Sequence, residues 1–403
     1  MASTLRLRLL ITEDVEDWAD MLKSGFSAKT AINCLNDLAT EVEISHSRHA
    51  VETFDILGKK FFHMASLDQN MPQATSSFIA PEHGLNIVRH ITRTGNPPLG
   101  AIYTGYGSPE YGNQVGREAS MPYKLKSAQD SQEGGEHYLT AEGYVSWCLE
   151  EFFPTHYVPR VLEMATESGL RDIRQKARLA LQKSRDALQY KHPDKVHLFM
   201  QQLDGLRESL LHHLVALTSA LDDTLAPPQA GQSAGAYIGW LREAWTALEK
   251  AQNSHFLRLR AFLGIGKDGQ MVQEYLNMGF ARLIRLRNEV THENKQYSWA
   301  SWIEMFAATV RVMDLLAWLI TRPLIAVPVK TGGDMLACAD YRKVPHENVT
   351  MPYPVPDALP EYDPATALFT RLSNRDDEPL MDISRAYQLR EQQGKLQATR
   401  LLP

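Results

Sequence analysis

Apolar and polar positions along the first third of the chain follow the periods of strands and helices in turn. Short apolar runs, each closed by a turn signal, predict strands at residues 5–11, 42–45, 61–67, 99–103 and 123–126. Helical spacing between and after these runs predicts helices at residues 18–38, 50–60, 83–91 and 109–120. The first helical pattern breaks near Gly25. Strands that alternate with helices in this way predict a doubly wound, five-stranded parallel sheet within residues 1–140.

Helical spacing dominates the middle of the chain, so the fold class is α/β followed by all-α. We expect a helical connector at 141–194 and a helical bundle at 195–330, with a long apolar helix face between 298 and 320. Residues 331–403 are rich in proline and predict an extended tail that ends in a charged helix at 381–396.

The run 170–190 carries many arginines and lysines at helical spacing. Such a run is typical of a solvated helix face or a two-helix stalk, and an RNA-binding groove is the alternative.

Composition limits the classes of partner. A hydrophobic content of 44% supports real cores, and a net charge of −6 gives no overall basic field, so any RNA contact must be local. No helix-turn-helix signature is present, and we expect no DNA binding. The cysteines Cys34, Cys148 and Cys338 form no CxxC pair and suit free thiols in a reducing cytoplasm. The first twelve residues lack a signal-peptide pattern, and charges and a proline interrupt the apolar run 310–329, so we expect no membrane span and a cytoplasmic protein.

Carboxylates stand where two of the predicted strands end. Glu13 and Asp14 follow the first strand, and Asp68 follows the third. Because parallel sheets place their chemistry just past the carboxyl ends of the strands, we expect these three side chains to lie together. Clustered carboxylates need a compensating cation, and carboxylate oxygens are ligands that Mg²⁺ prefers.

The order of motifs resembles a response-regulator receiver domain. After the acidic pair come Asp68-x-x-Met-Pro, a helix that begins Gly-Leu, the pair Thr104-Gly and Tyr123-x-x-Lys126. The resemblance covers about the first third of the chain. It implies that Asp68 accepts a phosphoryl group and holds Mg²⁺ together with Glu13 and Asp14. It also implies that Thr104 and Lys126 contact the phosphoryl group, that Tyr123 is an aromatic switch, and that a sensor histidine kinase or phosphotransfer protein is the partner.

Two features leave an alternative open. Residues 73–82 are inserted beside the expected site, where they could change access or the choice of kinase. A receiver-like domain can also keep the fold without accepting phosphate. Such domains usually lose an acid or the lysine, and this sequence keeps both.

A second polar motif lies in the helical region. Arg287 and Asn288 end one predicted helix, and His292 follows before the next, tryptophan-bearing helix. Histidine suits proton transfer near neutral pH, and arginine can stabilise a phosphorane charge with two parallel hydrogen bonds. The alternative is that Arg287 and Asn288 cap or salt-bridge the helix end, while His292 packs beside Trp299.

This motif resembles the Arg-x(4–6)-His motif of HEPN (higher eukaryotes and prokaryotes nucleotide-binding) domains over about residues 195–321. The resemblance implies a metal-independent endoribonuclease whose catalytic residues are Arg287, Asn288 and His292, acting on RNA as a homodimer, with no cofactor at that site. Receiver and nuclease together suggest a phosphorylation-controlled stress or phage-defence toxin. A non-catalytic signalling adaptor or an RNA-binding protein is the alternative.

Overall fold

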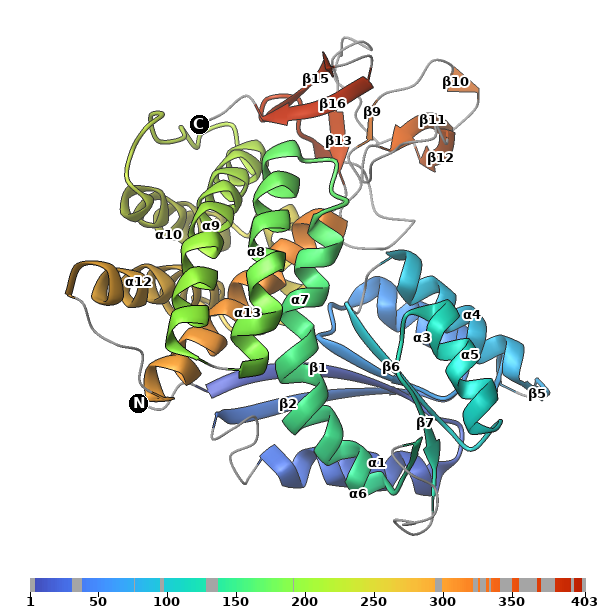
Figure 1. The fold of residues 1–403 in the computed structure, drawn as a ribbon. Helices are drawn as coiled ribbons and strands as arrows, with labels where there is room; N and C mark the ends of the chain where they lie inside the picture. The colour runs from blue at the N-terminus through green and yellow to red at the C-terminus, as the bar shows by residue number, and fades with distance from the viewer. Residues whose placement is uncertain are drawn as a thin grey trace. The chain divides into compact units, whose positions relative to one another are not determined.

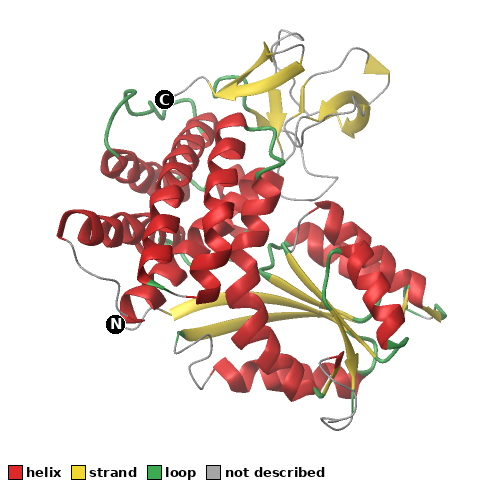
Figure 2. Cartoon of the chain, in the orientation of Figure 1, coloured by secondary structure: helices red, strands yellow, loops and turns green. Residues whose placement is uncertain are grey.

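The computed structural model describes residues 4–30, 38–75, 77–94, 98–127, 137–190, 192–293, 299–321, 325–326, 331–332, 335–340, 350–354, 368–370, 381–392 and 395–400. The chain divides into two compact units, Met1–Arg160 and Val161–Pro403. The first is built on a parallel sheet. The second is built mainly on packed helices, with short strands toward its end (Figures 1 and 2).

The sheet of the first unit has six parallel strands in the order β2-β1-β3-β6-β7-β8. They are β1 (Thr4–Thr12), β2 (Ala39–Ser47), β3 (Met64–Leu67), β6 (Leu99–Thr104), β7 (Tyr123–Lys126) and β8 (Tyr138–Leu139). The central strands β3 and β6 are wholly buried, because a parallel sheet is covered on both faces. Five of these strands are the predicted ones, and β8 adds a short sixth beside β7.

Helices cover both faces of this sheet. They are α1 (Glu16–Thr30), α3 (Ala50–Lys59), α4 (Pro81–Thr94), α5 (Pro109–Ala119), α6 (Ala141–Ser146), the π-helical η2 (Trp147–Phe152) and α7 (Phe153–Ala165), which runs into the second unit. α1 packs with α6, whereas α4 packs with both α3 and α5, and Figure 1 shows these two groups on opposite faces. The predicted doubly wound architecture is therefore confirmed.

Helix α1 is continuous through Gly25, so the predicted break at this glycine is wrong. A Cβ added to Gly25 would lie 3.0 Å from the Cγ2 methyl group of Val145 on α6. The glycine thus marks a close approach of two helices. Residues 31–37, over which the helical pattern was expected to continue, lie outside the described residues.

The second unit is a helical assembly, as predicted. Its helices are α8 (Arg171–Tyr190), α9 (Pro193–Leu221), α10 (Ala234–Lys250), α11 (Ser254–Phe262), the π-helical η3 (Val272–Ala281), α12 (Arg282–Glu293) and α13 (Trp299–Thr321). α8 packs along α9, and η3 contacts α10, α12 and α13. The predicted apolar face of α13 is confirmed, since Phe306, Val310 and Met313 are buried.

The described parts of the tail are strands. β9 (Ile325–Ala326), β10 (Thr331–Gly332), β11 (Met335–Asp340), β12 (Thr350–Pro354), β13 (Leu368–Thr370) and β14 (Met381–Asp382) form one sheet. β15 (Tyr387–Gln392) and β16 (Lys395–Arg400) pair antiparallel. The predicted helix at 381–396 is therefore wrong. The alternation of Tyr387 and Leu389 with polar residues has the period of a strand, and Gly394 lies between the two paired segments.

Two further expectations concern the cysteines and membranes. Cys148 is a buried free thiol, whereas Cys34 and the side chain of Cys338 lie outside what the structure describes. Among the described residues, no helix combines the length and the apolar character needed to cross a membrane.

Candidate functional site

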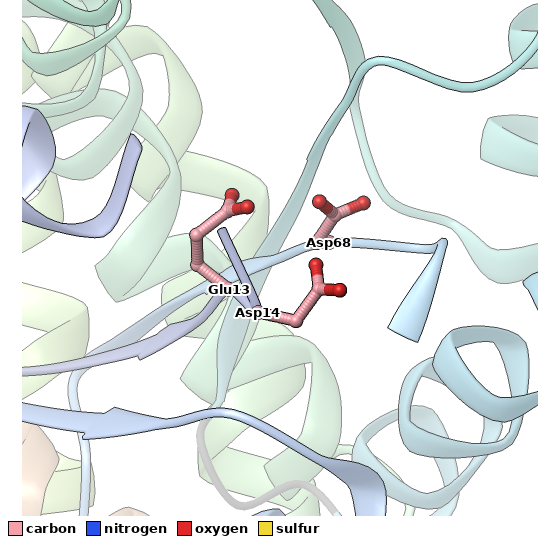
Figure 3. A group of neighbouring side chains, drawn as sticks. All are labelled: Glu13, Asp14 and Asp68. Atoms are coloured by element: carbon pink, nitrogen blue, oxygen red, sulfur yellow. The ribbon is translucent and has the colours of Figure 1, made fainter. Parts of the chain in front are cut away.

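The carboxyl ends of β1 and β3 bring three acidic side chains together. Thr12 pairs with Leu67 in the sheet, so the residues that follow these two strands meet at one edge. The backbone N–H of Asp68 donates to the carbonyl oxygen of Thr12 at 3.0 Å and to its hydroxyl at 2.9 Å, which fixes the loop. Oxygens of Glu13, Asp14 and Asp68 all lie within 4.8 Å of one another (Figure 3).

The next two strands supply donors to the same carboxylate. Thr104, the last residue of β6, donates its hydroxyl to Asp68 Oδ1 at 2.6 Å. Lys126, the last residue of β7, donates Nζ to Asp68 Oδ2 and to Glu13 Oε2, both at 2.5 Å. The structure therefore brings together all five residues predicted at this edge.

The site is buried and carries an excess of negative charge. Glu13 is only 1% exposed, and burial together with the charge of Asp68 raises its pKa to about 7. Burial and the same neighbour also raise the pKa of Asp14. Burial alone would lower the pKa of Lys126, but Asp68 and Glu13 outweigh it and the pKa lies above its usual value. One ammonium does not balance three carboxylates.

The donor set suits a small hard cation. Three carboxylates from two adjacent loops supply oxygen ligands on one side and leave other positions to water or to phosphate oxygens, as Mg²⁺ requires. Burial and the neighbouring Asp68 carboxylate raise the pKa values of Glu13 and Asp14 even though Lys126 bonds to Glu13, so the cluster holds more negative charge than this lysine offsets. These residues therefore fit a divalent cation.

Tyr123 occupies a slot beside this site. The ring is 7% exposed, and its hydroxyl donates to the carbonyl oxygen of Tyr106 and, at 3.3 Å, to Gln69 Oε1. A Cβ on Gly112 of α5 would lie 2.2 Å from the Tyr123 ring, so only glycine leaves room for the ring there. Glycine inside a helix usually lowers stability, and the need to make room for the Tyr123 ring explains why one stands at position 112.

Gln69 is a site residue that sequence reasoning missed. It follows Asp68 directly, is fully buried, and donates Nε2 to the hydroxyl of Tyr111 at 2.8 Å while its Oε1 accepts from Tyr123. It therefore links the Asp68 loop to α5 and β7. A glutamine after an aspartate carries no sequence signal, although the glycine at position 112 indicates that a large group packs against α5.

The inserted residues 73–82 contribute one strand of a small β-hairpin. β4 (Met71–Pro72) pairs antiparallel with β5 (Ile79–Ala80). Phe78 beside β5 is 74% exposed, and Ile79 within it is 52% exposed. The predicted insertion therefore places two apolar side chains on the surface, in the connection between β3 and α4 that follows Asp68.

A groove runs between α1 and α6 in the same unit. Its volume is about 710 Å³, and its lining includes Met21, Gly25, Val145 and the carboxylates of Asp17 and Glu142. α1 begins two residues after Asp14, so the groove starts near the acidic cluster.

The second predicted site is only partly described. Arg287, Asn288 and His292 all lie within α12, so this helix continues past its predicted end and includes His292, and the predicted next helix follows as the buried α13. Arg287 donates to Asn288 Oδ1 at 3.0 Å and lies 3.6 Å from Asp204 Oδ2 on α9. The side chain of His292 lies outside the described residues. Arg287 thus has a structural partner as well as a 39% exposed side chain.

A third polar cluster joins α8, α9 and β15. His213 is 1% exposed; its Nε2 lies 2.9 Å from Asp172 Oδ1, and its Nδ1 lies 2.7 Å from the hydroxyl of the buried Tyr387. Burial alone would raise the pKa of Asp172, but His213 holds it well below its usual value. The cluster fastens the C-terminal strand to the helices.

Comparison with known proteins finds solved structures similar to the first third of the chain. No protein-family model matches the sequence, and no curated protein matches it. A signal receiver domain from Vibrio parahaemolyticus is 17% identical, with a TM-score of 0.25, over 31% of this chain and 82% of that one. A CheY-like response regulator receiver domain protein from Methanospirillum hungatei is 22% identical, with a TM-score of 0.23, over 30% and 83%. A response regulator protein from Burkholderia pseudomallei, with a phosphorylated aspartic acid, calcium ion and citrate, is 16% identical, with a TM-score of 0.24, over 34% and 70%.

Proposed function

We propose that the first unit is the receiver of a response regulator and accepts a phosphoryl group on Asp68. The observation that carries the proposal is the convergence of Glu13, Asp14 and Asp68, with Thr104 and Lys126 both bonded to the Asp68 carboxylate. An acidic cluster that also holds a buried lysine and a hydroxyl suits transfer of a phosphoryl group better than simple cation storage.

Each residue has its own role in the proposed phosphoryl transfer. Asp68 attacks phosphorus in line with the leaving group, so an O–P bond forms to its carboxylate and the bond from phosphorus to the donor breaks. Lys126 and Thr104 already bond to the carboxylate oxygens and stand where phosphoryl oxygens would arrive. Glu13, Asp14 and Asp68 would hold Mg²⁺, which would offset the negative charge of the approaching group.

The phosphoryl donor in this proposal is a sensor histidine kinase or a phosphotransfer protein. The groove between α1 and α6 supports a protein donor, because it offers an apolar floor with exposed carboxylates beside the acidic cluster. Exposed Met21 and Val15 on and before α1 add to this apolar surface.

The test is labelling of purified full-length protein with a small phosphodonor and Mg²⁺. We expect a base-labile phosphoprotein that Asp68→Asn abolishes. Asp55→Asn is the matched control, since Asp55 is exposed on α3 and pairs with Lys59 of the same helix. Equal labelling of the Asp68→Asn and Asp55→Asn proteins would end the assignment.

We propose further that the helical region is a HEPN-like, metal-independent endoribonuclease. The support is the position of Arg287, Asn288 and His292 on α12, directly before the buried α13. Five residues rotate a helix by about 140° beyond a full turn, so positions 287 and 292 fall on different faces of α12. A homodimer that sets Arg287 of one protomer beside His292 of another would bring both to one phosphate.

Cleavage of RNA by the full-length protein in EDTA tests the second proposal. His292→Ala should lower the rate by about 10²–10⁴-fold, the usual contribution of a general acid or base. His197→Ala on the surface of α9 is the control. If the His292→Ala protein cleaves as fast as the control, the helical region acts instead as a signalling adaptor or a non-cleaving RNA-binding part.

Phosphorylation would control the nuclease through the dimer. A phosphoryl group on Asp68 shifts the population only by its differential affinity for two protomer arrangements. A toxic nuclease held in check in this way suits a stress or phage-defence response. Comparison of cleavage and solution mass with and without beryllofluoride tests the control, and no difference in either quantity would refute it.

A further inference from the structure

Helix α8 is the most basic stretch of the described chain. Its twenty residues hold six arginines and lysines but only Asp172 and Asp186 as acids, although the whole chain has a net charge of −6. Its apolar face is buried, including Ile173, Ala177 and Ala180, and it packs along α9. The helix is therefore anchored by one face and presents its charged face outward.

The arginines of α8 form a stripe, and the lysines do not belong to it. The stripe consists of Arg171, Arg174, Arg178 and Arg185. At about 100° and 1.5 Å per residue, these four positions fall within an arc of about 60° and span about 21 Å along the helix. Lys176 and Lys183 lie about 150–170° away around the axis. The structure agrees with this placement of the lysines. A Cβ atom added to Gly205 of α9 would lie 3.2 Å from Lys176 Nζ, so Lys176 is on the side of α8 that adjoins α9.

Two arginines of the stripe have no ion-pair partner among the described carboxylates. Both acids of α8 are engaged elsewhere, Asp172 with His213 and Asp186 with Lys195 at 3.6 Å. Arg178 and Arg185 are exposed, and no ion pair joins either to a described carboxylate.

Arg174 shows the crowding of like charge along the stripe. One of its nitrogens donates to the carbonyl oxygen of Ser168 at 3.0 Å. Burial first, and then the charges of Arg178 and Arg171, lower the pKa of Arg174. An anion placed along the stripe would relieve this repulsion.

We propose that the arginine stripe of α8 binds the sugar-phosphate backbone of single-stranded RNA. The proposal rests on the RNA-directed part of the proposed function and names the surface that holds the strand. Guanidinium forks match phosphate oxygens with two parallel hydrogen bonds. A straight row of charges suits a flexible strand, whereas a duplex backbone winds away from it. Four guanidinium groups spread over about 21 Å can each meet a different phosphate of one strand.

An anionic membrane is the less suitable occupant. A helix that binds a membrane surface inserts an apolar face below its basic face. The apolar face of α8 is already covered within the second unit. Leu179 and Tyr190 of α8 are exposed, but at about 100° per residue they lie about 110–130° around the axis from the centre of the stripe, so no apolar surface adjoins the arginines.

Binding of a fluorescent single-stranded RNA to full-length protein over a range of salt tests the proposal. Each phosphate contact contributes about 0.7 to the slope of log affinity against log salt concentration. One contact therefore raises the affinity at 0.1 M salt by a factor of about five relative to the affinity at 1 M salt. The double variant Arg178→Gln/Arg185→Gln should therefore bind about 25-fold more weakly and lose about 1.4 from the slope. The matched control Lys176→Gln/Lys183→Gln loses the same charge from the other side of α8 and should bind within about twofold of wild type.

The possible outcomes distinguish RNA binding by the arginine stripe from RNA cleavage. All proteins carry His292→Ala in the binding assay, so binding is measured whether or not the chain cleaves RNA. A selective loss in the stripe variant supports the proposal even where cleavage is absent. Equal losses in both double variants would assign the effect to overall charge and overturn it. Absence of RNA binding would also overturn the proposal. If the protein then binds vesicles of anionic lipid and the stripe variant does not, the stripe is a membrane contact instead.

Discussion

Protonation of Glu13 should compete with Mg²⁺ at the acidic edge of the sheet. Burial and the nearby Asp68 carboxylate raise the pKa of Glu13 to about 7, so near neutral pH the side chain is about half protonated. A carboxyl group must lose its proton before it binds a metal ion, and Mg²⁺ binding should therefore release protons in this range. We expect the affinity for Mg²⁺ to rise as the pH rises from 6 to 8.

The size of the effect follows from the fraction of Glu13 that is ionised. With a pKa of about 7 that fraction is about one eleventh at pH 6 and about ten elevenths at pH 8. The apparent affinity should therefore rise about tenfold, or about 1.4 kcal/mol, across these two pH units. Binding should release about 0.9 proton at pH 6 and about 0.1 at pH 8.

Stability of the metal-free protein should show the opposite trend. The folded pKa of Glu13 lies above its ordinary value of 4.5, so between these two values the folded chain binds more protons than the unfolded chain. The free energy of unfolding should therefore fall as the pH rises from about 4.5 to about 7. Glu13→Gln removes the free-energy cost of ionising this buried carboxyl group. The variant should therefore be more stable than the metal-free wild type at pH 8 by up to about 3 kcal/mol.

Isothermal titration calorimetry with Mg²⁺ in buffers of different ionisation enthalpy measures affinity and proton release together. Glu13→Gln should bind Mg²⁺ more weakly and lose most of the pH dependence between 6 and 8. Glu52→Gln, at an exposed position on α3 where the side chain accepts a hydrogen bond from a backbone N–H, serves as the control and should keep the dependence. A wild-type affinity that stays constant across these pH values, with no proton release, would refute the reasoning.

Three other predictions concern packing and the C-terminal cluster. Gly112→Ala should cost about 1–3 kcal/mol because its methyl group would overlap the Tyr123 ring, whereas Gly239→Ala on α10 has open space and should gain up to about 1 kcal/mol; urea unfolding measures both. Tyr387→Phe should leave the buried histidine short of a partner, cost about 1–3 kcal/mol and speed hydrogen exchange in the C-terminal strands, and unchanged exchange would contradict this. The pKa of Asp172 is depressed, so its contribution to stability is present above its ordinary value of 3.8 and is lost as the pH falls below that value; Asp172→Asn should remove this part of the acid dependence.

Patterns local in sequence predicted the sheet and its acidic edge. Apolar runs predicted the strands, and the rule that parallel strands end at one edge placed Asp68 beside Glu13 and Asp14. The resemblance to receiver domains added Thr104 and Lys126, which the structure places at the ends of their strands and bonded to Asp68.

The errors and omissions depend on contacts between distant residues. Gly25 looked like a break because its reason for being glycine is Val145, 120 positions later in the sequence. The link from His213 to Tyr387 spans 174 positions, and no local pattern announces it. The C-terminal hairpin was taken for a helix because its charged residues suit either period, and only pairing between its two halves decides between them.

The slot around Tyr123 ties the Asp68 loop to α5 and β7 through packing as well as hydrogen bonds. Thr104 bonds to Asp68, and the tyrosine ring lies inward against Gln69 and Gly112. If the first unit switches as proposed, a stimulus can shift the ring only by its differential affinity for the inward and outward positions. Enlarging the side chain at position 112 would press on the ring and move that equilibrium toward the outward position.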